Sequence, residues 1–384
     1  MAKLVLPVII PLLVWSVVVI RHMWKGRKLK IAYACFVLQD MAVAWLLICP
    51  NPYLYGMGTN TLLGIIVLLS AQAIFNLMVT AAILARLAAR KMCDVPFDSG
   101  RRDFIRNSMF YPAMAGGVSL GGGFMENHQE QVLREIELPV KGLTAPDGYR
   151  IVQLSDIHLG PFFSLEQLSL LLEKASQQGG DILAVTGDLF DSDEKTNLEA
   201  VRILDGYAPS FPDGIYIVFG NHEYHRAING VRQCLSASRI CLLQNNAAQV
   251  PGKALWVAGV DYPRNKETFR EDREKYHRMA LRNVPQGMTA ILLAHHPECI
   301  DDGARSGIAL TLTGHTHGGQ FCILGQPLFP IFRYNRGLVK SGDSYGYVHS
   351  GNGSWFPCRI GCPPEIAVFT LRAAQQDLEH SNRG

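Results

Sequence analysis

The 384-residue sequence predicts an α/β domain that follows an apolar N-terminal region of three to four transmembrane helices. Two observations support this prediction. Residues 1 to about 125 are strongly apolar, whereas the rest alternates short apolar runs with amphipathic segments. In addition, at least five of those apolar runs end in a residue that can bind a metal ion. Because ligands of α/β sheets collect at the carboxyl ends of strands, these endings indicate one site.

Composition excludes two other classes of protein. The net charge is only +3, and no basic patch with interleaved aromatic residues occurs, so we expect no nucleic-acid partner. The nine cysteines include no Cys-x-x-Cys pair, which argues against a structural zinc site.

Three apolar runs in the N-terminal region are long enough to span a bilayer: residues 4–20, 31–49 and 61–85. The second contains Asp40, so a buried helix of a soluble protein remains an alternative for that run. A fourth stretch, residues 108–125, is uncharged but rich in glycine, and it is a weaker spanning candidate.

The loops between these runs predict their orientation. Basic residues follow the first and the third run, and the positive-inside rule places both basic loops in the cytoplasm. Arg101 and Arg102, just before the fourth stretch, resemble a twin-arginine export motif. We therefore expect a bacterial inner-membrane protein whose soluble domain lies on the periplasmic or outer side, where Cys358 and Cys362 could pair.

A short buried strand is predicted at residues 150–158, where an apolar run ends in Asp156 and His158. Ser164 follows as a helix N-cap, with Gln167 at the capping-box position. Two glycines, Gly179 and Gly180, end that helix.

The later predicted strands also run into polar residues, and a charged helical segment at 266–282 separates two of them. These strands and their endings are 181–186 with Asp188, 214–219 with Asn221, 255–260 with Asp261, 289–294 with His295, and 308–312 with His315 and His317.

His315 and His317 stand two residues apart, followed by Gly318 and Gly319. Side chains of a strand alternate with period two, so both imidazoles can project to one side. Taken alone, the pair would be explained better as two histidines in a surface turn. The other strand endings favour a metal site.

Seven residues form the candidate ligand set. They mix carboxylates, imidazoles and one amide without a thiolate, which suits Mn²⁺, Fe or Zn²⁺ better than Cu(I), Ca²⁺ or Mg²⁺. Seven ligands exceed the need of one ion with an open position, and two ions about 3.5–4 Å apart would activate water and assist displacement at phosphorus. The set is Asp156, His158, Asp188, Asn221, His295, His315 and His317.

These motifs, in this order, resemble those of the calcineurin-like metallophosphoesterases over roughly residues 150–320. Three further stretches, 155–160, 318–320 and 359–366, look most like the bacterial membrane-anchored YaeI/YkuE-like phosphodiesterase branch. The resemblance implies a four-layer α/β/β/α sandwich with a di-metal centre between two sheets.

The resemblance also implies a role for each residue. Asp156, His158 and His317 would hold one ion, and a second ion would have three other ligands, with a bridging carboxylate between the two. The ligands of the second ion are Asn221, His295 and His315, and the bridge is Asp188. His222 would not bind metal; it would hydrogen-bond the substrate phosphate and help to protonate the leaving oxygen.

We therefore expect a membrane-anchored di-metal phosphoesterase, with Mn²⁺ the favoured ion and Fe or Zn²⁺ as alternatives. Its substrate would be a phosphodiester, a pyrophosphate or a phosphomonoester in a phosphorylated small molecule or a lipid. Some relatives hydrolyse UDP-2,3-diacylglucosamine in lipid A synthesis. The alternative is a membrane-bound binding or sensory protein whose phosphoesterase fold no longer catalyses.

The expected domain boundaries are 1–125 for the membrane region, 126–149 for a linker with a first strand, 150–372 for the catalytic domain and 373–384 for a polar tail. Four other residues carry expectations. Glu223 should orient a neighbour, and His296 should point away from the site if its strand continues. His277 and His349 should be surface histidines rather than ligands.

Overall fold

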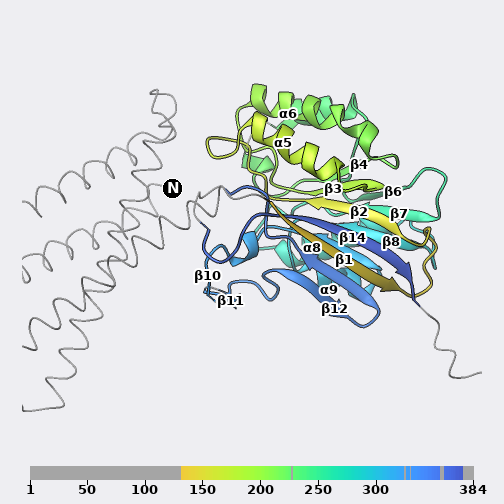
Figure 1. Ribbon diagram of the computed structural model, residues 1–384. Helices are drawn as coiled ribbons and strands as arrows, with labels where there is room; N and C mark the ends of the chain where they lie inside the picture. Colours follow the sequence, from red (N-terminus) through yellow and green to blue (C-terminus); the bar gives the residue numbers. More distant parts are fainter. Residues whose placement is uncertain (1–130, 226–227, 324–325, 329, 355–358, 375–384) are drawn as a thin grey trace, which may run out of the picture. The chain divides into compact units, whose positions relative to one another are not determined.

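The computed structural model describes residues 131–225, 228–323, 326–328, 330–354 and 359–374 (Figure 1). All of them belong to the second of the two units into which the chain divides, Met125–Gly384. The predicted transmembrane runs, the twin-arginine motif and Cys358 lie outside the described residues. Within those residues, no helix has the length and apolar character needed to cross a membrane.

Two mixed six-stranded sheets form the centre of the domain. The first has the order β1-β14-β2-β3-β4-β5, in which only β14 and β2 pair antiparallel. Its strands are β1 (Val132–Val140), β14 (Glu365–Ala373), β2 (Tyr149–Leu154), β3 (Ile182–Thr186), β4 (Ile215–Val218) and β5 (Ile240–Leu242). Strand β1 lies in the segment expected to hold a linker and a first strand, and it forms an edge of this sheet.

The second sheet has the order β12-β13-β9-β8-β7-β6, with a parallel centre and an antiparallel strand at each edge. Its strands are β12 (Gly337–Ser341), β13 (Ser344–Val348), β9 (Leu310–Thr313), β8 (Thr289–Leu293), β7 (Leu255–Gly259) and β6 (Asn246–Gln249). A separate hairpin joins β10 (Cys322–Ile323) to β11 (Gln326–Pro327).

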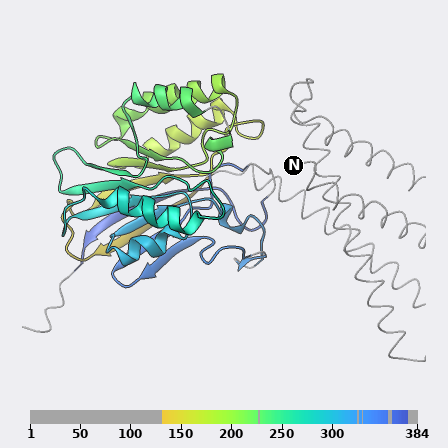
Figure 2. The same ribbon diagram turned by 180° about the vertical axis from the view of Figure 1, so that it is seen from behind.

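Helices cover the outer faces of both sheets, so the predicted α/β/β/α layering is present (Figure 1; Figure 2). The first sheet is covered by α5 (Leu165–Ser176), α6 (Glu194–Gly206) and α7 (Ile228–Ser236), and the second by α8 (Phe269–Leu281) and α9 (Cys299–Arg305). The predicted capping box begins α5: the hydroxyl of Ser164 accepts from the Gln167 amide at 3.2 Å, and the Gln167 side chain accepts from the Ser164 amide at 2.8 Å.

Three apolar layers hold the sandwich together, one under each set of helices and one between the sheets. Strand β2 shows how the sequence builds two of them. Val152 packs toward the helices and Ile151 toward the second sheet, as the period of two requires. Because both faces are buried, such strands are continuously apolar, which explains why their ends are easily recognised in the sequence.

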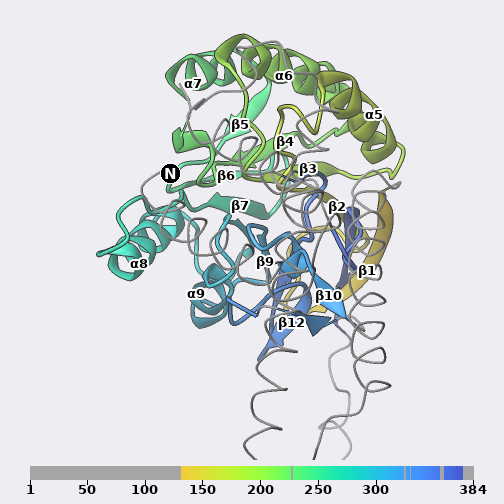
Figure 3. The ribbon, with the colours of Figure 1, turned by 90° about the vertical axis from the view of Figure 1, so that its left-hand side faces the viewer.

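The strand ends that carry the candidate residues meet at one end of the sandwich, seen end-on in Figure 3. The loops there are tied to one another through backbone hydrogen bonds. The amide of Asp156 donates to the carbonyl of Gly187 at 3.0 Å, and the amide of Gly314 donates to the carbonyl of His295 at 3.1 Å. Between the sheets, the amide of His315 after β9 donates to the carboxylate of Asp156 after β2 at 3.0 Å, so strands of both sheets contribute loops to one site.

Candidate metal centre

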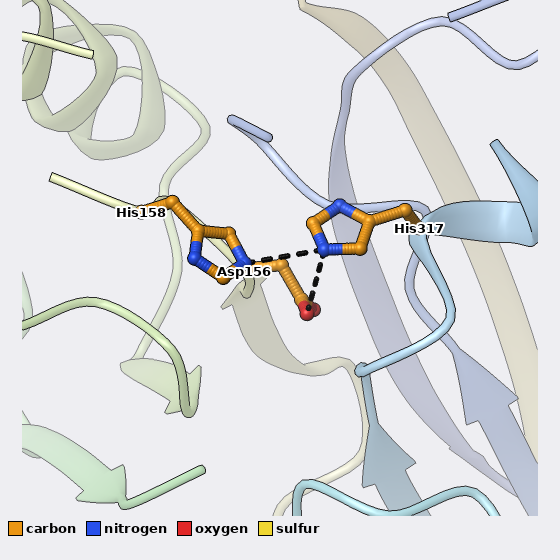
Figure 4. Close-up of side chains that lie close together, drawn as sticks. All are labelled: Asp156, His158 and His317. Carbon is orange, nitrogen blue, oxygen red and sulfur yellow. Dashed lines mark hydrogen bonds and ion pairs between the residues drawn. The ribbon is translucent and has the colours of Figure 1, made fainter. Parts of the chain in front are cut away.

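Two clusters of predicted ligands lie at this end of the sandwich, and a third group of possible ligands among the described residues combines His158 with Asp191 and His222. Asp156, His158 and His317 each offer a ligand atom, and these atoms lie within 4.8 Å of one another, as Figure 4 shows for the three side chains. A second cluster with the same spacing consists of Asp188, His295 and His315. The structure therefore brings together six of the seven residues of the predicted ligand set in two groups of three.

Asp188 lies between the two clusters. Its Oδ2 atom is 3.6 Å from Nε2 of His158 in the first cluster and 3.1 Å from Nε2 of His295 in the second. Burial by itself would raise the pKa of the Asp188 carboxyl, but the neighbouring histidines outweigh burial and hold that pKa well below its usual range. A single ionised carboxylate thus reaches both possible ion positions.

Asn221, the seventh predicted ligand, has an unpaired polar atom. Its Oδ1 atom is buried and has no hydrogen-bond partner among the described residues. An amide oxygen left in this state costs about 1–3 kcal/mol. A bound cation would satisfy it, so the residues present fit a metal centre. This unsatisfied oxygen favours a metal site independently of the motifs.

The backbone at the site is strained. Seven non-glycine residues of the described chain have positive φ, and five of them belong to the ligand set. Such left-handed conformations cost energy in residues with a Cβ and concentrate at functional sites. The five are Asp156, His158, Asp188, His315 and His317.

The expected reason for the placement of His315 and His317 is wrong. Strand β9 ends at Thr313, so period-two alternation does not extend to either histidine. The two rings instead leave a tight turn in which both residues have left-handed φ values, 73° and 49°. As a result they separate, and His317 joins Asp156 while His315 joins Asp188.

Two glycines allow the loops to approach one another. A Cβ on Gly187, whose φ is +92°, would lie 2.6 Å from Nδ1 of His295 and 2.7 Å from the amide nitrogen of Gly220. A Cβ on Gly314 would overlap a carboxylate oxygen of Asp156. Glycine at these positions is therefore a requirement of the site rather than of the strands.

Glu223 is fully buried, and its carboxylate organises two of the loops. It accepts hydrogen bonds from the amides of Asp188 at 3.1 Å, Leu189 at 2.7 Å, Phe190 at 3.0 Å and Gly220 at 2.7 Å. Its position matches the expectation that it orients neighbours. Burial and the nearby charge of Asp188 raise the pKa of Glu223.

Asp191 is a functional candidate that the sequence reasoning missed. Its Oδ2 atom accepts from Nδ1 of His222 at 2.7 Å and from Nδ1 of His158 at 3.0 Å. Burial opposes the charged form of the His222 ring, but the bond to Asp191 and the charge of Asp188 outweigh it and raise the pKa of His222. The only available signal was the position of Asp191 three residues after Asp188, at the end of the same loop.

Aromatic side chains line the second cluster. The ring centre of Phe332 lies 5.2 Å from that of His315, and Tyr262 lies 5.7 Å from the same ring. His296 also contacts His315, at 5.3 Å, because β8 ends at Leu293 and the chain bends before the two histidines. The expectation that His296 points away is therefore wrong, and burial lowers the pKa of its ring to about 2.

Behind the first cluster lies Arg359, which is fully buried. Its guanidinium donates to the carbonyl of Ser350 at 2.6 Å, and Nη2 lies 3.4 Å from Nδ1 of His317. In the same region Cys362 is a free thiol whose Sγ lies 3.2 Å from the carbonyl oxygen of His317. Its predicted partner, Cys358, is not among the described residues.

Two histidines expected at the surface are buried. His349 is 0% exposed, and its Nδ1 atom accepts from the amide of Gly351 at 2.9 Å in the loop behind Asp156. His277 is 6% exposed and lies 2.8 Å from the hydroxyl of Ser306, between α8 and α9. Neither is part of a ligand cluster among the described residues, so only the surface part of that expectation is wrong.

Comparison with known proteins gives consistent matches. A family model described as calcineurin-like phosphoesterase matches residues 149–319, a range that contains every predicted ligand and His222. The uncharacterized metallophosphoesterase YkuE of Bacillus subtilis is 28% identical over 290 residues, which cover 71% of this chain and 98% of that protein. An uncharacterized metallophosphoesterase of Helicobacter pylori is 30% identical over 282 residues, 72% of this chain and 73% of the relative.

A third relative matches over more of the chain. A Bos taurus protein described as a transmembrane protein with metallophosphoesterase domain is 27% identical over 373 residues. The match covers 89% of this chain and 82% of the bovine protein, so it extends into residues outside the described part.

Proposed function

The chain belongs to the calcineurin-like metallophosphoesterases and is a metal-dependent phosphoesterase, and from this premise we propose that it is a membrane-anchored enzyme with a two-metal centre. The observation that carries the two-metal assignment is the position of Asp188, whose Oδ2 atom reaches a histidine of each cluster. The bond cleaved is a phosphodiester, a pyrophosphate or a phosphomonoester.

In this proposal each ion has its own ligands, and Asp188 is shared. Asp156, His158 and His317 hold the first ion. The second is held by His295, His315 and the buried oxygen of Asn221. The donor set of oxygen and imidazole nitrogen favours Mn²⁺, with Fe or Zn²⁺ as alternatives. When bound, two such ions supply a water of lowered pKa and neutralise charge on the phosphoryl group.

His222 provides the proton for the leaving oxygen in this proposal. Its Nδ1 atom is committed to Asp191, so Nε2 is the nitrogen left to face a substrate. The side chain is 24% exposed and therefore accessible from solution. The Asp191 carboxylate fixes the tautomer and stabilises the charged ring, as the carboxylate of a catalytic triad does.

We propose a substrate with an apolar part, such as a lipid phosphoester. The support is the loop that follows the β10–β11 hairpin. Phe332 packs on the His315 ring, and the preceding residue, Ile331, is 81% exposed, while Leu328 is 51% exposed. Exposed apolar side chains beside a metal centre indicate contact with an apolar partner. UDP-2,3-diacylglucosamine is one candidate of this class.

Membrane anchoring and location are part of the same proposal. The apolar runs before residue 125 and the match to the bovine transmembrane protein support an anchor of three to four helices. The charge pattern and the twin arginines favour a catalytic domain on the outer side of a bacterial inner membrane. A domain there would meet membrane lipids rather than a cytosolic nucleotide-linked lipid. A reporter fused after residue 125 that is active only in the cytoplasm would overturn the orientation.

The central experiment is turnover of bis-p-nitrophenyl phosphate, phospholipids and UDP-2,3-diacylglucosamine by the purified full chain with added Mn²⁺, together with its metal content. We expect two ions per chain and hydrolysis of at least one of these substrates. Asp188→Asn should abolish turnover because the shared ligand is lost. Substantial turnover of that variant with two bound ions would refute the assignment. Lack of turnover by the wild-type chain would favour the binding-protein alternative.

A further inference from the structure

Two buried cysteines meet behind the turn that carries His317. Cys322, at the start of β10, is 3% exposed, and Cys362 is 0% exposed. A hydrogen bond joins their side chains, and both are free thiols in this structure. The part of the chain that the structure describes therefore offers Cys362 a partner other than the expected Cys358.

Both sulfur atoms contact the backbone of the same turn. Sγ of Cys362 lies 3.2 Å from the carbonyl oxygen of His317, and Sγ of Cys322 lies 3.2 Å from the carbonyl oxygen of Gly318. A Cβ on Gly318, whose φ is +63°, would overlap Sγ of Cys362. The two thiols are therefore held side by side against consecutive residues of the turn.

The segments that carry the two cysteines are paired through their backbones. The amide of Cys322 donates to the carbonyl of Ile360 at 2.7 Å, and a Cβ on Gly361 would lie 3.4 Å from Cβ of Cys322. A disulfide bond requires backbones that lie close together and side chains that point toward each other. Paired segments directly before Cys362, together with the contact between the thiols, meet both requirements.

The turn itself has an unfavourable backbone. Four consecutive residues have left-handed φ values, from 49° to 86°: His317, Gly318, Gly319 and Gln320. Residues with a Cβ adopt this conformation only where the surrounding structure enforces it. The amide of Ile360 donates to the carbonyl of Gln320 at 3.0 Å and supports one end of the turn. A covalent bond between the cysteines would support the end at which His317 joins the first cluster.

We propose that Cys322 and Cys362 form a disulfide bond that locks the turn carrying His317 to the segment at 359–362. The oxidant is another disulfide, of a thiol oxidoreductase or of oxidised glutathione, in the outer compartment proposed above. One cysteine thiolate attacks a sulfur of that disulfide, which forms a mixed disulfide and releases one thiolate. The second cysteine thiolate attacks the mixed disulfide, and the Sγ–Sγ bond forms. The oxidant leaves as two thiols, which carry the two electrons and the two protons of the cysteines.

The first test is peptide mapping of the full chain, because trypsin separates the three cysteines. Cys322 lies in peptide 306–333, Cys358 in 341–359 and Cys362 in 360–372. The chain is reduced in mild urea, returned to buffer with oxidised glutathione, alkylated after denaturation and digested. We expect 306–333 to be linked to 360–372 in most molecules. Alkylation of both cysteines after oxidation, or a link between 341–359 and 360–372, would overturn the proposal.

The second test is the release of Mn²⁺ to EDTA, which rests on the proposed function because it takes His317 as a ligand. One of the two ions should leave the reduced chain about tenfold faster than the oxidised chain. This is the lower end of the effect of losing a contact that orients a metal ligand. Equal release from the two forms would overturn the locking of the turn.

Variants of two cysteines separate the proposed bond from general effects of oxidation. Cys322→Ser should release that ion at the rate of the reduced wild-type chain, with or without the oxidant. Cys358→Ser is the matched control and should keep both the link and the slow release. A chain that forms the link but binds no metal in either form would count against the proposed function and leave the disulfide bond supported.

Discussion

The Oδ2 atom of Asp191 lies 2.7 Å from Nδ1 of His222. The same oxygen is 3.0 Å from Nδ1 of His158, so one carboxylate orients both a proposed metal ligand and the proposed proton donor. Carboxylates in this position fix the imidazole tautomer in metal sites and in catalytic triads. The contact of Asp191 with both rings leads to a prediction about kcat and about the pH dependence of kcat.

Asp191→Asn should lower kcat by about 10²-fold or more, because the His222 ring loses its orienting acceptor. The pH profile should also change. Asp191 and Asp188 raise the pKa of His222, so the protonated ring persists below that raised value and is lost as pH rises through it. Removing one of these charges lowers the pKa, and the alkaline limb of kcat should move to lower pH.

The measurement for Asp191 is kcat across pH 5 to 10 in the metal-loaded enzyme. Asp343→Asn serves as the control, since Asp343 is 67% exposed and pairs with Lys141 at the surface. An Asp191→Asn enzyme with the wild-type alkaline limb would show that His222 is not the proton donor.

Glu223→Gln should destabilise the domain by about 3 kcal/mol or more. The carboxylate accepts four amide hydrogen bonds, whereas a glutamine presents one oxygen and turns an NH₂ group toward the remaining donors. Each buried amide left unpaired costs about 1–3 kcal/mol. Urea unfolding of the metal-free chain would measure the change. A loss below about 1 kcal/mol would mean that the carboxylate is not the support of these loops.

The sequence predicted the elements whose determinants are local. The capping box at Ser164 and the apolar strands are short-range signals, and the two mixed sheets confirm the α/β prediction. His315 and His317 were recognised by type and spacing, but their left-handed backbone could not be inferred from a pattern that resembled a strand. Arg359 could not have been found in this way, because its contact with His317 joins residues 42 positions apart.

Asp191 illustrates a different reason why a residue of the site cannot be predicted from the sequence. It follows Asp188 by three residues and has no strand pattern of its own, so only its position beside two histidines identifies it. Glu223 was recognised as an orienting residue, yet its four amide partners lie in two separate loops. The candidate ligands could therefore be predicted from the sequence, whereas the residues whose hydrogen bonds position them mostly could not.

Asn221→Ala should have different effects on the stability of the metal-free protein and on the metal content of the loaded protein. The Oδ1 atom of Asn221 is buried and has no hydrogen-bond partner in the part of the chain that the structure describes, so removing it should leave the metal-free chain as stable as before or more stable by about 1 kcal/mol. The metal-loaded chain should lose its second ion. Metal analysis after gel filtration should give about one ion per chain, against two for the wild type. A variant that retains two ions with unchanged affinity would remove Asn221 from the ligand set.

The apolar loop beside the centre leads to the last prediction. Ile331 and Leu328 are 81% and 51% exposed, and Ile331 directly precedes the Phe332 ring that packs on His315. Burial of a large aliphatic side chain contributes about 1.5–3 kcal/mol, so contact of even part of these two with an acyl chain is worth about tenfold in binding. The double variant Leu328→Ser with Ile331→Ser should therefore raise KM about tenfold for a long-chain phospholipid and leave KM for bis-p-nitrophenyl phosphate within about twofold.

Leu170→Ser is the matched control, because Leu170 is 52% exposed on α5. Equal KM changes for the lipid and the soluble diester would show that the loop shapes the centre rather than contacting an apolar substrate. An unchanged lipid KM would remove the loop from substrate binding altogether.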